Sequence, residues 1–367
     1  MHDPPAGRRV PPPLLDSLGR ELADLRVSVT DRCNFRCRYC MPRERFGSEH
    51  RFLDRSDLLS FEEITRLASI FVSLGVGKIR LTGGEPLLRR GLPKLVSMLA
   101  SLGTDLALTT NGSLLSRHAD ALAAAGLRRI TVSLDALDEE TFQQMSDSAV
   151  SVADVLAGIT AAERAGLSPL KLNVVVRRGL NEHAIGAMVD RFAGSGHVVR
   201  FIEYMDVGTT NGWRLDHVLT AEEILSVVRT RTGLEPIAPD RPGEVASRYR
   251  RIDGGGEIGV IASVSRPFCR DCVRARLSSD GRLHTCLFST GGTALGYALR
   301  HGVPDSQIAS MIRSAWHLRD DRYSELRSDA TRPSAAVPVT LAGSAERAGR
   351  PTPAPGAEKV EMSYIGG

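Results

Sequence analysis

The chain has 367 residues, of which 42% are apolar and 25% charged, with a formal net charge of +4. These values are typical of a globular protein with a large core, and the small net charge gives no sign of a nucleic-acid or membrane surface. No run of about 18 or more apolar residues occurs, which excludes a transmembrane helix, and 5% aromatic residues are too few for rows of base-stacking platforms.

The N-terminal segment is rich in proline and arginine and lacks the apolar stretch and cleavage site of a secretory signal. We therefore expect residues 1–20 to be flexible and the protein to be cytoplasmic. Thiols stay reduced in the cytoplasm, so clustered cysteines there are more often metal ligands or catalytic groups than disulfides.

Short apolar or β-branched runs predict six β-strands: 25–30, 78–82, 106–110, 129–134, 170–176 and 198–205. Helical patterns fill most of the intervals: 60–75, 92–102, 114–125, 152–165 and 181–192. The clearest helix begins with a capping box of Ser60 and Glu63 and ends before Gly75. This alternation predicts an α/β fold of about six β/α units with parallel strands, either an open doubly wound sheet or a partial barrel.

Polar, glycine-rich sequence follows one predicted strand after another. These stretches are 30–33, 82–86, 109–112, 133–135 and 205–206. They lie at the C-terminal ends of the predicted strands, which is where parallel α/β folds place their sites. We therefore expect the functional site at this end of the sheet.

The alternation stops after about residue 215. Another capped helix begins at Thr220, and from residue 328 the composition shifts to alanine, proline, glycine, serine and threonine, as in flexible linkers. An apolar, glycine-ended tail follows this linker, which suggests that the tail docks. The predicted domains are a flexible segment (1–20), a β/α domain (21–215), a C-terminal region (216–327), a linker (328–359) and a tail (360–367).

All six cysteines belong to two triads. The first comprises Cys33, Cys37 and Cys40, and the second comprises Cys269, Cys272 and Cys286. Three thiolates cannot pair off as disulfides, and they are one ligand short of a closed zinc or iron–sulfur site. Each triad is therefore expected to leave one coordination position open for a substrate or cofactor.

The first triad follows the first predicted strand with the spacing C-x3-C-x2-C. Such closely spaced thiols can bind one cubic [4Fe–4S] cluster; zinc completed by His50 is the alternative, although zinc sites prefer paired C-x2-C knuckles. Residues 33–40, CNFRCRYC, resemble the signature of the radical S-adenosylmethionine (SAM) enzymes. In that family the open iron binds SAM, and one electron from the cluster cleaves SAM to a 5′-deoxyadenosyl radical.

The resemblance implies a partial TIM-type barrel and further contacts to SAM. The family's Gly-Gly-Glu-Pro motif matches residues 83–86, where glycine would let the backbone approach the methionine moiety of SAM closely. The SAM-binding positions that it implies are Tyr39, Gly84, Ser133 and Met205. Without the resemblance, Met205 would be interpreted as a core residue.

The second triad combines a C-x2-C knuckle with a cysteine that lies fourteen residues further on. The intervening residues 278–283 predict a β-hairpin with Asp280-Gly281 as its two-residue turn, which would place Cys286 opposite Ala275. A zinc ribbon with His284 as the fourth ligand is the alternative.

Arg274 and Arg276 follow this knuckle and would share one face of the hairpin strand. Guanidinium groups form bidentate, charge-assisted bonds to phosphate. A phosphorylated substrate held by these arginines could then reach the open iron of a second cluster.

Much of the chain also resembles the radical SAM enzymes that cyclise GTP in molybdenum cofactor biosynthesis, most closely at residues 25–33, 201–208, 268–281 and 366–367. This resemblance implies a C-terminal extension with a second [4Fe–4S] cluster, whose open iron binds the guanine of GTP, and a Gly366-Gly367 tail that inserts toward the active site. The GTP contacts that it implies are Arg26, Arg80, Thr109, Lys171, Arg274, Ala275 and Arg276.

In the implied reaction the radical removes the C3′ hydrogen of the ribose, C3′ adds to C8 of guanine, and reduction completes the product, with no acid or base needed for the first step. The implied partners are GTP, a flavodoxin- or ferredoxin-like electron donor and the downstream cyclic pyranopterin monophosphate synthase. Monomer and homodimer both remain open. The alternatives are a peptide-modifying radical SAM enzyme with two clusters and a non-catalytic zinc or iron–sulfur scaffold.

Overall fold

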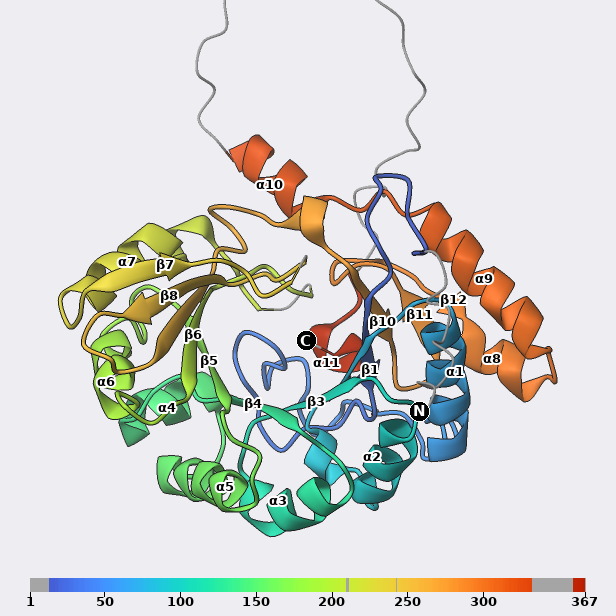
Figure 1. The fold of residues 1–367 in the computed structure, drawn as a ribbon, viewed down its shortest axis with the longest axis horizontal. Helices are drawn as coiled ribbons and strands as arrows, with labels where there is room; N and C mark the ends of the chain where they lie inside the picture. The colour runs from blue at the N-terminus through green and yellow to red at the C-terminus, as the bar shows by residue number, and fades with distance from the viewer. Residues whose placement is uncertain (1–12, 209–210, 242, 332–358, 367) are drawn as a thin grey trace, which may run out of the picture.

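The computed structural model describes residues 13–208, 211–241, 243–331 and 359–366. Strands form an arc around the centre of the molecule, with most helices outside it (Figure 1). Six parallel strands make up most of this arc: β1 (Asp24–Ser28), β2 (Lys78–Thr82), β3 (Asp105–Thr110), β4 (Arg129–Ser133), β5 (Lys171–Val176) and β6 (Val198–Glu203). Each coincides with a predicted strand.

The order of these strands distinguishes the two predicted architectures. Strands β1 to β6 lie side by side in chain order and pair in parallel throughout. A doubly wound sheet would reverse its strand order at a switch point, whereas a barrel does not. The two edge strands of the whole sheet are not neighbours in it, so the ring stays open among the described residues. The structure is a partial β/α barrel.

Seven helices accompany these strands: α1 (Phe61–Ser73), α2 (Leu92–Ala100), α3 (Leu115–Ala124), α4 (Glu139–Ser146), α5 (Val152–Arg164), α6 (Ala184–Arg191) and α7 (Ala221–Arg229). The Ser60 side chain accepts a hydrogen bond from the Glu63 amide at 3.1 Å, and the Glu63 carboxylate accepts one from the Ser60 amide at 2.7 Å, which confirms the capping box. The sequence analysis did not predict α4. Buried side chains of the helices and strands, such as Leu67, Ile79 and Leu172, form one core.

The C-terminal region continues the same sheet on both sides of the six strands. On one side are β9 (Glu257–Ile261), β8 (Ser247–Arg251) and β7 (Leu234–Ile237), and on the other are β10 (Arg274–Leu277), β11 (Arg282–His284) and β12 (Thr293–Ala294). Strand β10 pairs in parallel with β1, and β9 pairs in parallel with β6. Strand β10 therefore brings the second cysteine triad beside the first strand of the barrel.

The remaining helices are α8 (Leu295–Arg300), α9 (Asp305–His317), α10 (Tyr323–Thr331) and α11 (Met362–Ile365). In Figure 1, α9 and α10 lie outside the ring of strands, while α11 lies inside it. Of the described residues, none belongs to a helix that is long and apolar enough to cross a membrane.

The structure differs from the prediction of a flexible segment through residue 20. Leu14, Asp16 and Arg20 are each less than 10% exposed, and Trp316 donates a hydrogen bond through its indole nitrogen to the Arg20 carbonyl at 3.1 Å. The proline-rich composition suggested flexibility. Composition gives no information about contacts between residues far apart in sequence, and Trp316 lies about 300 residues from Arg20. The segment from Leu14 onward is therefore anchored to the rest of the molecule, although Leu15 and Leu18 are exposed.

Gly84 is required for the close approach of two loops. A Cβ atom at this position would overlap the Arg32 carbonyl, in the loop that carries the first triad. We expect Gly84→Ala to lower the free energy of unfolding of the cluster-free chain by about 1–3 kcal/mol, because backbone must move to make room. Gly77→Ala is the matched control, since no heavy atom lies within 4 Å of its Cβ position. Equal denaturant midpoints for the two variants would refute this account.

Candidate active site

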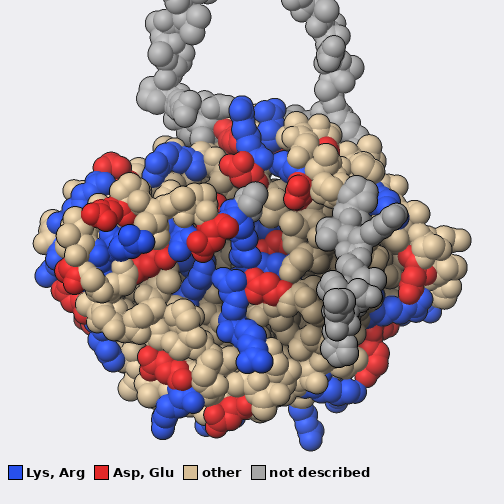
Figure 2. Space-filling model, viewed as in Figure 1, with Lys and Arg blue, Asp and Glu red and all other residues tan. Residues whose placement is uncertain are grey.

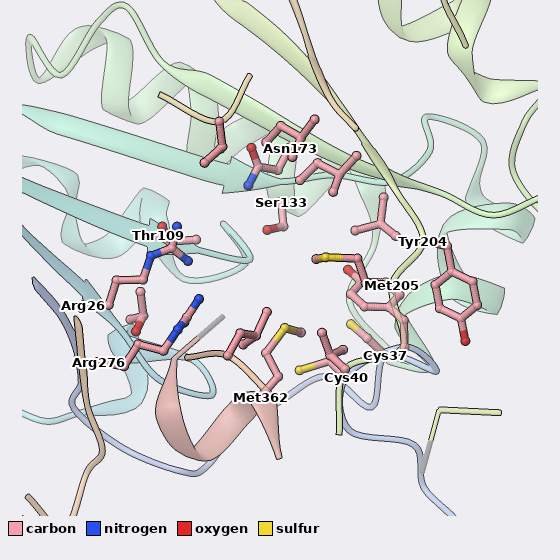
Figure 3. A pocket seen from close by; sticks show the side chains of 18 of the residues that line it. Arg26, Cys37, Cys40, Thr109, Ser133, Asn173, Tyr204, Met205, Arg276 and Met362 are labelled. Carbon is pink, nitrogen blue, oxygen red and sulfur yellow. The ribbon is translucent and has the colours of Figure 1, made fainter. Parts of the chain in front are cut away.

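A cavity of about 310 Å³ lies inside the ring of strands. Its lining includes all six cysteines and the polar residues that follow the strands, such as Thr82, Thr109, Ser133 and Met205. Figure 3 shows Arg26 and Arg276 on one side of this cavity and Cys37, Cys40 and Met205 on the other. The cavity thus joins a basic side to a thiol-lined side.

The first triad lies on the long loop after β1 and is fixed by contacts to neighbouring strand ends. Tyr39, between Cys37 and Cys40 in sequence, donates a hydrogen bond through its hydroxyl to the Asp135 carboxylate at 2.8 Å. The other oxygen of Asp135 accepts from the Val175 amide at 2.8 Å. This chain of bonds connects the triad to the ends of β4 and β5, and burial raises the pKa of Asp135 to about 6.

The glycine motif after β2 has a packing role in addition to the predicted one. A Cβ on Gly83 would lie 2.5 Å from the Thr30 carbonyl, so this pair of glycines lets the β2 loop pack against the triad loop. Glu85 then joins β2 to β3, since its carboxylate accepts hydrogen bonds from the Thr110 hydroxyl and the Asn111 amide, both at 2.7 Å. Both glycines also line the cavity, and their contact with SAM stays a prediction.

The two triads lie at opposite ends of the neighbouring strands β1 and β10. Asp24, the first residue of β1, pairs with Arg274, the first residue of β10, so Cys272 lies near the start of β1. Cys33 comes after Ser28, the last residue of β1, and so lies near the other end of this strand. A strand rises by about 3.3 Å per residue, so these two strand ends are roughly 13 Å apart. A ligand between the triads must therefore be extended.

The hairpin that returns Cys286 to the knuckle has a register different from the predicted one. Arg276 pairs with His284 and Leu277 pairs with Leu283, so the continued register places Cys286 opposite Arg274 rather than Ala275. The loop has three residues between Ser278 and Arg282 and includes Gly281 with a φ of 86°. A three-residue hairpin loop needs a residue with positive φ at this position, and glycine adopts such a φ without strain.

Buried arginines form a row across three adjacent strands between the triads. Arg26 of β1 pairs with Arg276 of β10 on one side and with Arg80 of β2 on the other. Burial, together with the guanidinium groups of Arg276 and Arg274, lowers the pKa of Arg26 well below its usual value. Its Nε is buried and has no hydrogen-bond partner among the described residues. Uncompensated positive charge of this kind fits a polyanionic ligand.

Arg274 connects this row to the second triad. Its guanidinium donates to the Cys272 sulfur at 3.4 Å. Burial raises the pKa of the Cys272 thiol, but the charges of Arg274 and Arg319 outweigh it and bring the value down to about 6. A thiol held as thiolate suits a metal ligand. Burial raises the pKa of the Cys33 thiol, and of the Cys286 thiol in the second triad, to about 12, so ionising these thiols fits a bound cationic cluster.

Neither predicted zinc alternative has its fourth ligand in place. The His50 ring lies between the rings of Phe46 and Phe52, each 4.6 Å away. The Nδ1 atom of His284 bonds to Ser289 and Gly291, and this histidine does not line the cavity. Two open triads on one cavity fit two cubic clusters better.

The C-terminal tail enters the cavity and is held at both of its ends. The Lys359 ammonium contacts the Asp206 carboxylate at 3.2 Å and the Tyr323 hydroxyl at 2.7 Å. Helix α11 follows, Met362 lines the cavity, and the Gly366 carbonyl accepts a hydrogen bond from Arg276. Figure 3 shows α11 and Met362 beside Cys40. Gly367 lies outside the described residues.

Two of the predicted GTP contacts are not among the residues that line the cavity. Ala275 is fully buried in the core, because it alternates with Arg274 and Arg276 and faces the opposite side of β10. Lys171 begins β5, two residues before the cavity-lining Asn173, and burial lowers its pKa to about 8. It lies on the inner face of the strand but toward its N-terminal end.

Sequence analysis missed Arg200 and Asn173, which also line the cavity. The Arg200 guanidinium donates to the Asn173 side chain at 2.7 Å, and burial with the charge of Arg80 lowers its pKa to about 9. The sequence did contain a sign of this role, because Arg200 interrupts the mostly apolar strand β6 at a position whose side chain points into the barrel.

Figure 2 shows lysine and arginine side chains gathered across the middle of the molecule in the view of Figure 1, with a few acidic side chains among them.

We expect Arg200→Met to raise KM for GTP, the substrate that the family resemblance implies, by about 10- to 100-fold, which corresponds to one lost charge-assisted hydrogen bond. Steady-state kinetics with saturating SAM measures this change. Arg117→Met, at an exposed position on α3, is the control and should leave KM unchanged. An unchanged KM in Arg200→Met would show that this guanidinium does not contact the substrate.

Comparisons with known proteins agree with this geometry. Residues 27–192 match the Radical SAM superfamily, and residues 197–325 match the family Molybdenum Cofactor Synthesis C. GTP 3′,8-cyclase of Acidothermus cellulolyticus is 53% identical over 97% of this chain and 99% of its own length. The chain belongs to the GTP 3′,8-cyclase family. GTP 3′,8-cyclase of Xanthomonas axonopodis is 50% identical over 90% of this chain and 99% of its own length. GTP 3′,8-cyclase of Staphylococcus haemolyticus is 47% identical over 86% of this chain and 94% of its own length.

Among solved structures, Streptococcus suis SuiB bound to S-adenosylmethionine superposes with a TM-score of 0.56 at 14% identity, over 84% of this chain and 69% of SuiB. This likeness confirms the radical SAM fold. Radical SAM enzymes use SAM with a [4Fe–4S] cluster, and GTP 3′,8-cyclases carry two clusters, so the predicted cofactors are confirmed at the level of the family.

Proposed function

We propose that this chain converts GTP to (8S)-3′,8-cyclo-7,8-dihydroguanosine 5′-triphosphate, the first step of molybdenum cofactor biosynthesis. The main support is the pair of cysteine triads at opposite ends of β1 and β10, with the buried arginines Arg26 and Arg276 between them. This arrangement offers two open metal sites and a binding place for a triphosphate on one cavity. A non-catalytic scaffold would need neither the shared cavity nor the uncompensated positive charge.

We assign SAM and its cluster to the first triad and GTP and the second cluster to the other. Cys33, Cys37 and Cys40 would hold the first cluster, with SAM near Tyr39, Gly84, Ser133 and Met205. Cys269, Cys272 and Cys286 would hold the second cluster, which would offer an open coordination position to the guanine of GTP. When bound, SAM and the first cluster supply a carbon radical that takes the hydrogen atom from ribose C3′.

The chain's own residues bind, orient and shield the reactants. Arg26, Arg80, Arg274 and Arg276 offer guanidinium groups to the triphosphate, and the rigid strands β1, β2 and β10 fix their positions. Thr109 and Thr131 each accept a hydrogen bond from Arg80, at 2.9 and 3.1 Å, which holds its side chain in the cavity. Helix α11 lies inside the ring of strands and contributes Met362 to the lining of the cavity, so the tail would displace water from that part of it.

The reaction also implies partners. It consumes electrons, so the proposal includes a low-potential donor of the flavodoxin or ferredoxin type, and cyclic pyranopterin monophosphate synthase as the enzyme that takes up the product. The proposal includes a cytoplasmic location, which is supported by the use of all six cysteines as metal ligands, since thiols stay reduced there.

Anaerobic reconstitution followed by incubation with SAM, a reductant and GTP tests this function. We expect 5′-deoxyadenosine and the cyclised nucleotide in comparable amounts. If 5′-deoxyadenosine does not form, the radical reaction is refuted. If it forms without the cyclised nucleotide, GTP is not the substrate.

A further inference from the structure

A buried charged network lies behind the second triad, outside the cavity. It consists of Asp16, Arg20 and Arg319, whose side chains are 0%, 2% and 1% exposed. Asp16 and Arg20 belong to the segment before β1, and Arg319 follows α9. None of the three lines the cavity, so the proposed reaction does not use them directly.

The Asp16 carboxylate holds the two arginines together. Its Oδ2 accepts from the Arg20 Nε at 2.6 Å and from an Arg319 terminal nitrogen at 3.1 Å. Its Oδ1 accepts from the amides of Leu18 and Arg20, both at 2.9 Å. The carboxylate is therefore fully bonded, and it fixes both guanidinium groups in one geometry.

The two arginines in turn hold the backbone of the second triad. Arg20 donates to the Cys269 carbonyl at 2.8 Å, and Arg319 donates to the Cys272 carbonyl at 2.7 Å. The Nε of Arg319 also donates to the Thr285 carbonyl at 3.1 Å, next to Cys286. Each cysteine of the triad, or its direct neighbour in sequence, is thus bonded to this network.

The network also places positive charge behind the thiols. Asp16 neutralises one of the two guanidinium charges, and Asp321, 3.7 Å from Arg319 and 29% exposed, offsets part of the other, so the positive charge that remains behind the thiols is less than one unit. A buried ion pair adds little to the free energy of unfolding, because removing the charges from water costs about as much as their attraction gains. Apolar residues of the same volume often stabilise a core equally well. A role beyond stability is therefore indicated.

We infer that Asp16, Arg20 and Arg319 are positioning residues for the second iron–sulfur cluster. They fix the carbonyls of its cysteine segments and, through the positive charge behind the thiolates, raise its reduction potential, because positive charge stabilises the reduced cluster. This inference rests on the proposed function, since it takes the second triad as a cluster site.

The test isolates the second cluster in the full-length chain by replacing Cys33, Cys37 and Cys40 with alanine. In this background, Arg319→Met removes the charge and all of its hydrogen bonds, whereas Arg319→Lys keeps the charge but cannot reach every acceptor. Arg251→Met is the matched control: that arginine is 6% exposed and donates to the Val189 carbonyl at 2.7 Å, but it lies on β8.

Three quantities are measured in each variant: the rate of iron loss to a chelator, the reduction potential from an EPR-monitored titration, and the unfolding temperature. We expect Arg319→Met to lose iron at least about tenfold faster and to have a more negative potential. Arg319→Lys should lose iron faster at a nearly unchanged potential. Arg251→Met should change only the unfolding temperature.

If Arg319→Met lowers the unfolding temperature but leaves iron loss and potential unchanged, the residue is only structural and the inference is wrong. If Arg319→Met does not fold, the rate of iron loss is compared in Arg319→Lys and Arg20→Lys instead. Unchanged rates of iron loss in both variants refute the inference. If the parent with an intact second triad binds no cluster, the proposed function itself fails, which is a distinct result.

Discussion

Cys37→Ser should lose both 5′-deoxyadenosine and the cyclised nucleotide, whereas Cys272→Ser should lose only the nucleotide. The two residues belong to triads at opposite ends of β1 and β10, so each substitution affects one proposed cluster. SAM cleavage needs only the cluster of the first triad. Quantifying both products in single reactions with excess SAM and reductant measures this split.

Cluster content must be determined in the same samples, because each variant should keep roughly half of the iron of the unaltered protein. Cys272→Ser should still give 5′-deoxyadenosine at a slower, GTP-independent rate. The assignment of separate roles is wrong if Cys272→Ser stops SAM cleavage as completely as Cys37→Ser while its first cluster remains intact.

Gly366→Ala should reduce formation of the cyclised nucleotide by on the order of 100-fold, the cost of a small misplacement at an active site. A Cβ on Gly366 would overlap the Thr82 hydroxyl, and the φ of 74° is unfavourable for alanine. The tail would then lose its bond to Arg276, which also faces the proposed triphosphate site. Product assays on fully reconstituted enzyme measure this loss, and iron content should stay unchanged.

Two variants separate the collision from backbone strain. Gly302→Ala is the matched control, since Gly302 has the same φ of 74° but no heavy atom within 4 Å of its Cβ position. Adding Thr82→Ala to Gly366→Ala removes the colliding hydroxyl and should restore part of the activity. Full activity of Gly366→Ala would mean that docking of the tail is not required for turnover.

Local patterns were sufficient to predict strands β1 to β6 and the helices α1, α2, α3, α5, α6 and α7. Strands β1 to β6 are short apolar runs bounded by glycine-rich turns, and the capping box at Ser60 is decided by residues three apart. Helix α4 was missed because its sequence, EETFQQMS, is mostly polar and has a low apolar content. The choice between barrel and doubly wound sheet depends on strand order, which is a tertiary property.

Features that depend on distant contacts could not be predicted. The two glycines after β2 were predicted to make room for a ligand, and their close approach to the Thr30 and Arg32 backbone was not foreseen. The hairpin at Gly281 was expected to have a two-residue turn, and one extra loop residue shifted Cys286 opposite Arg274. Arg200 was missed because its neighbours on other strands could not be known from the sequence of β6.

The most direct test of the account uses GTP with deuterium at ribose C3′. The reaction is run anaerobically with SAM and reductant, and both products are analysed by mass spectrometry. We expect one deuterium atom in 5′-deoxyadenosine and none at C3′ of the cyclised nucleotide. If 5′-deoxyadenosine forms without deuterium, the hydrogen atom does not come from C3′, and the placement of SAM and GTP on one shared cavity is contradicted.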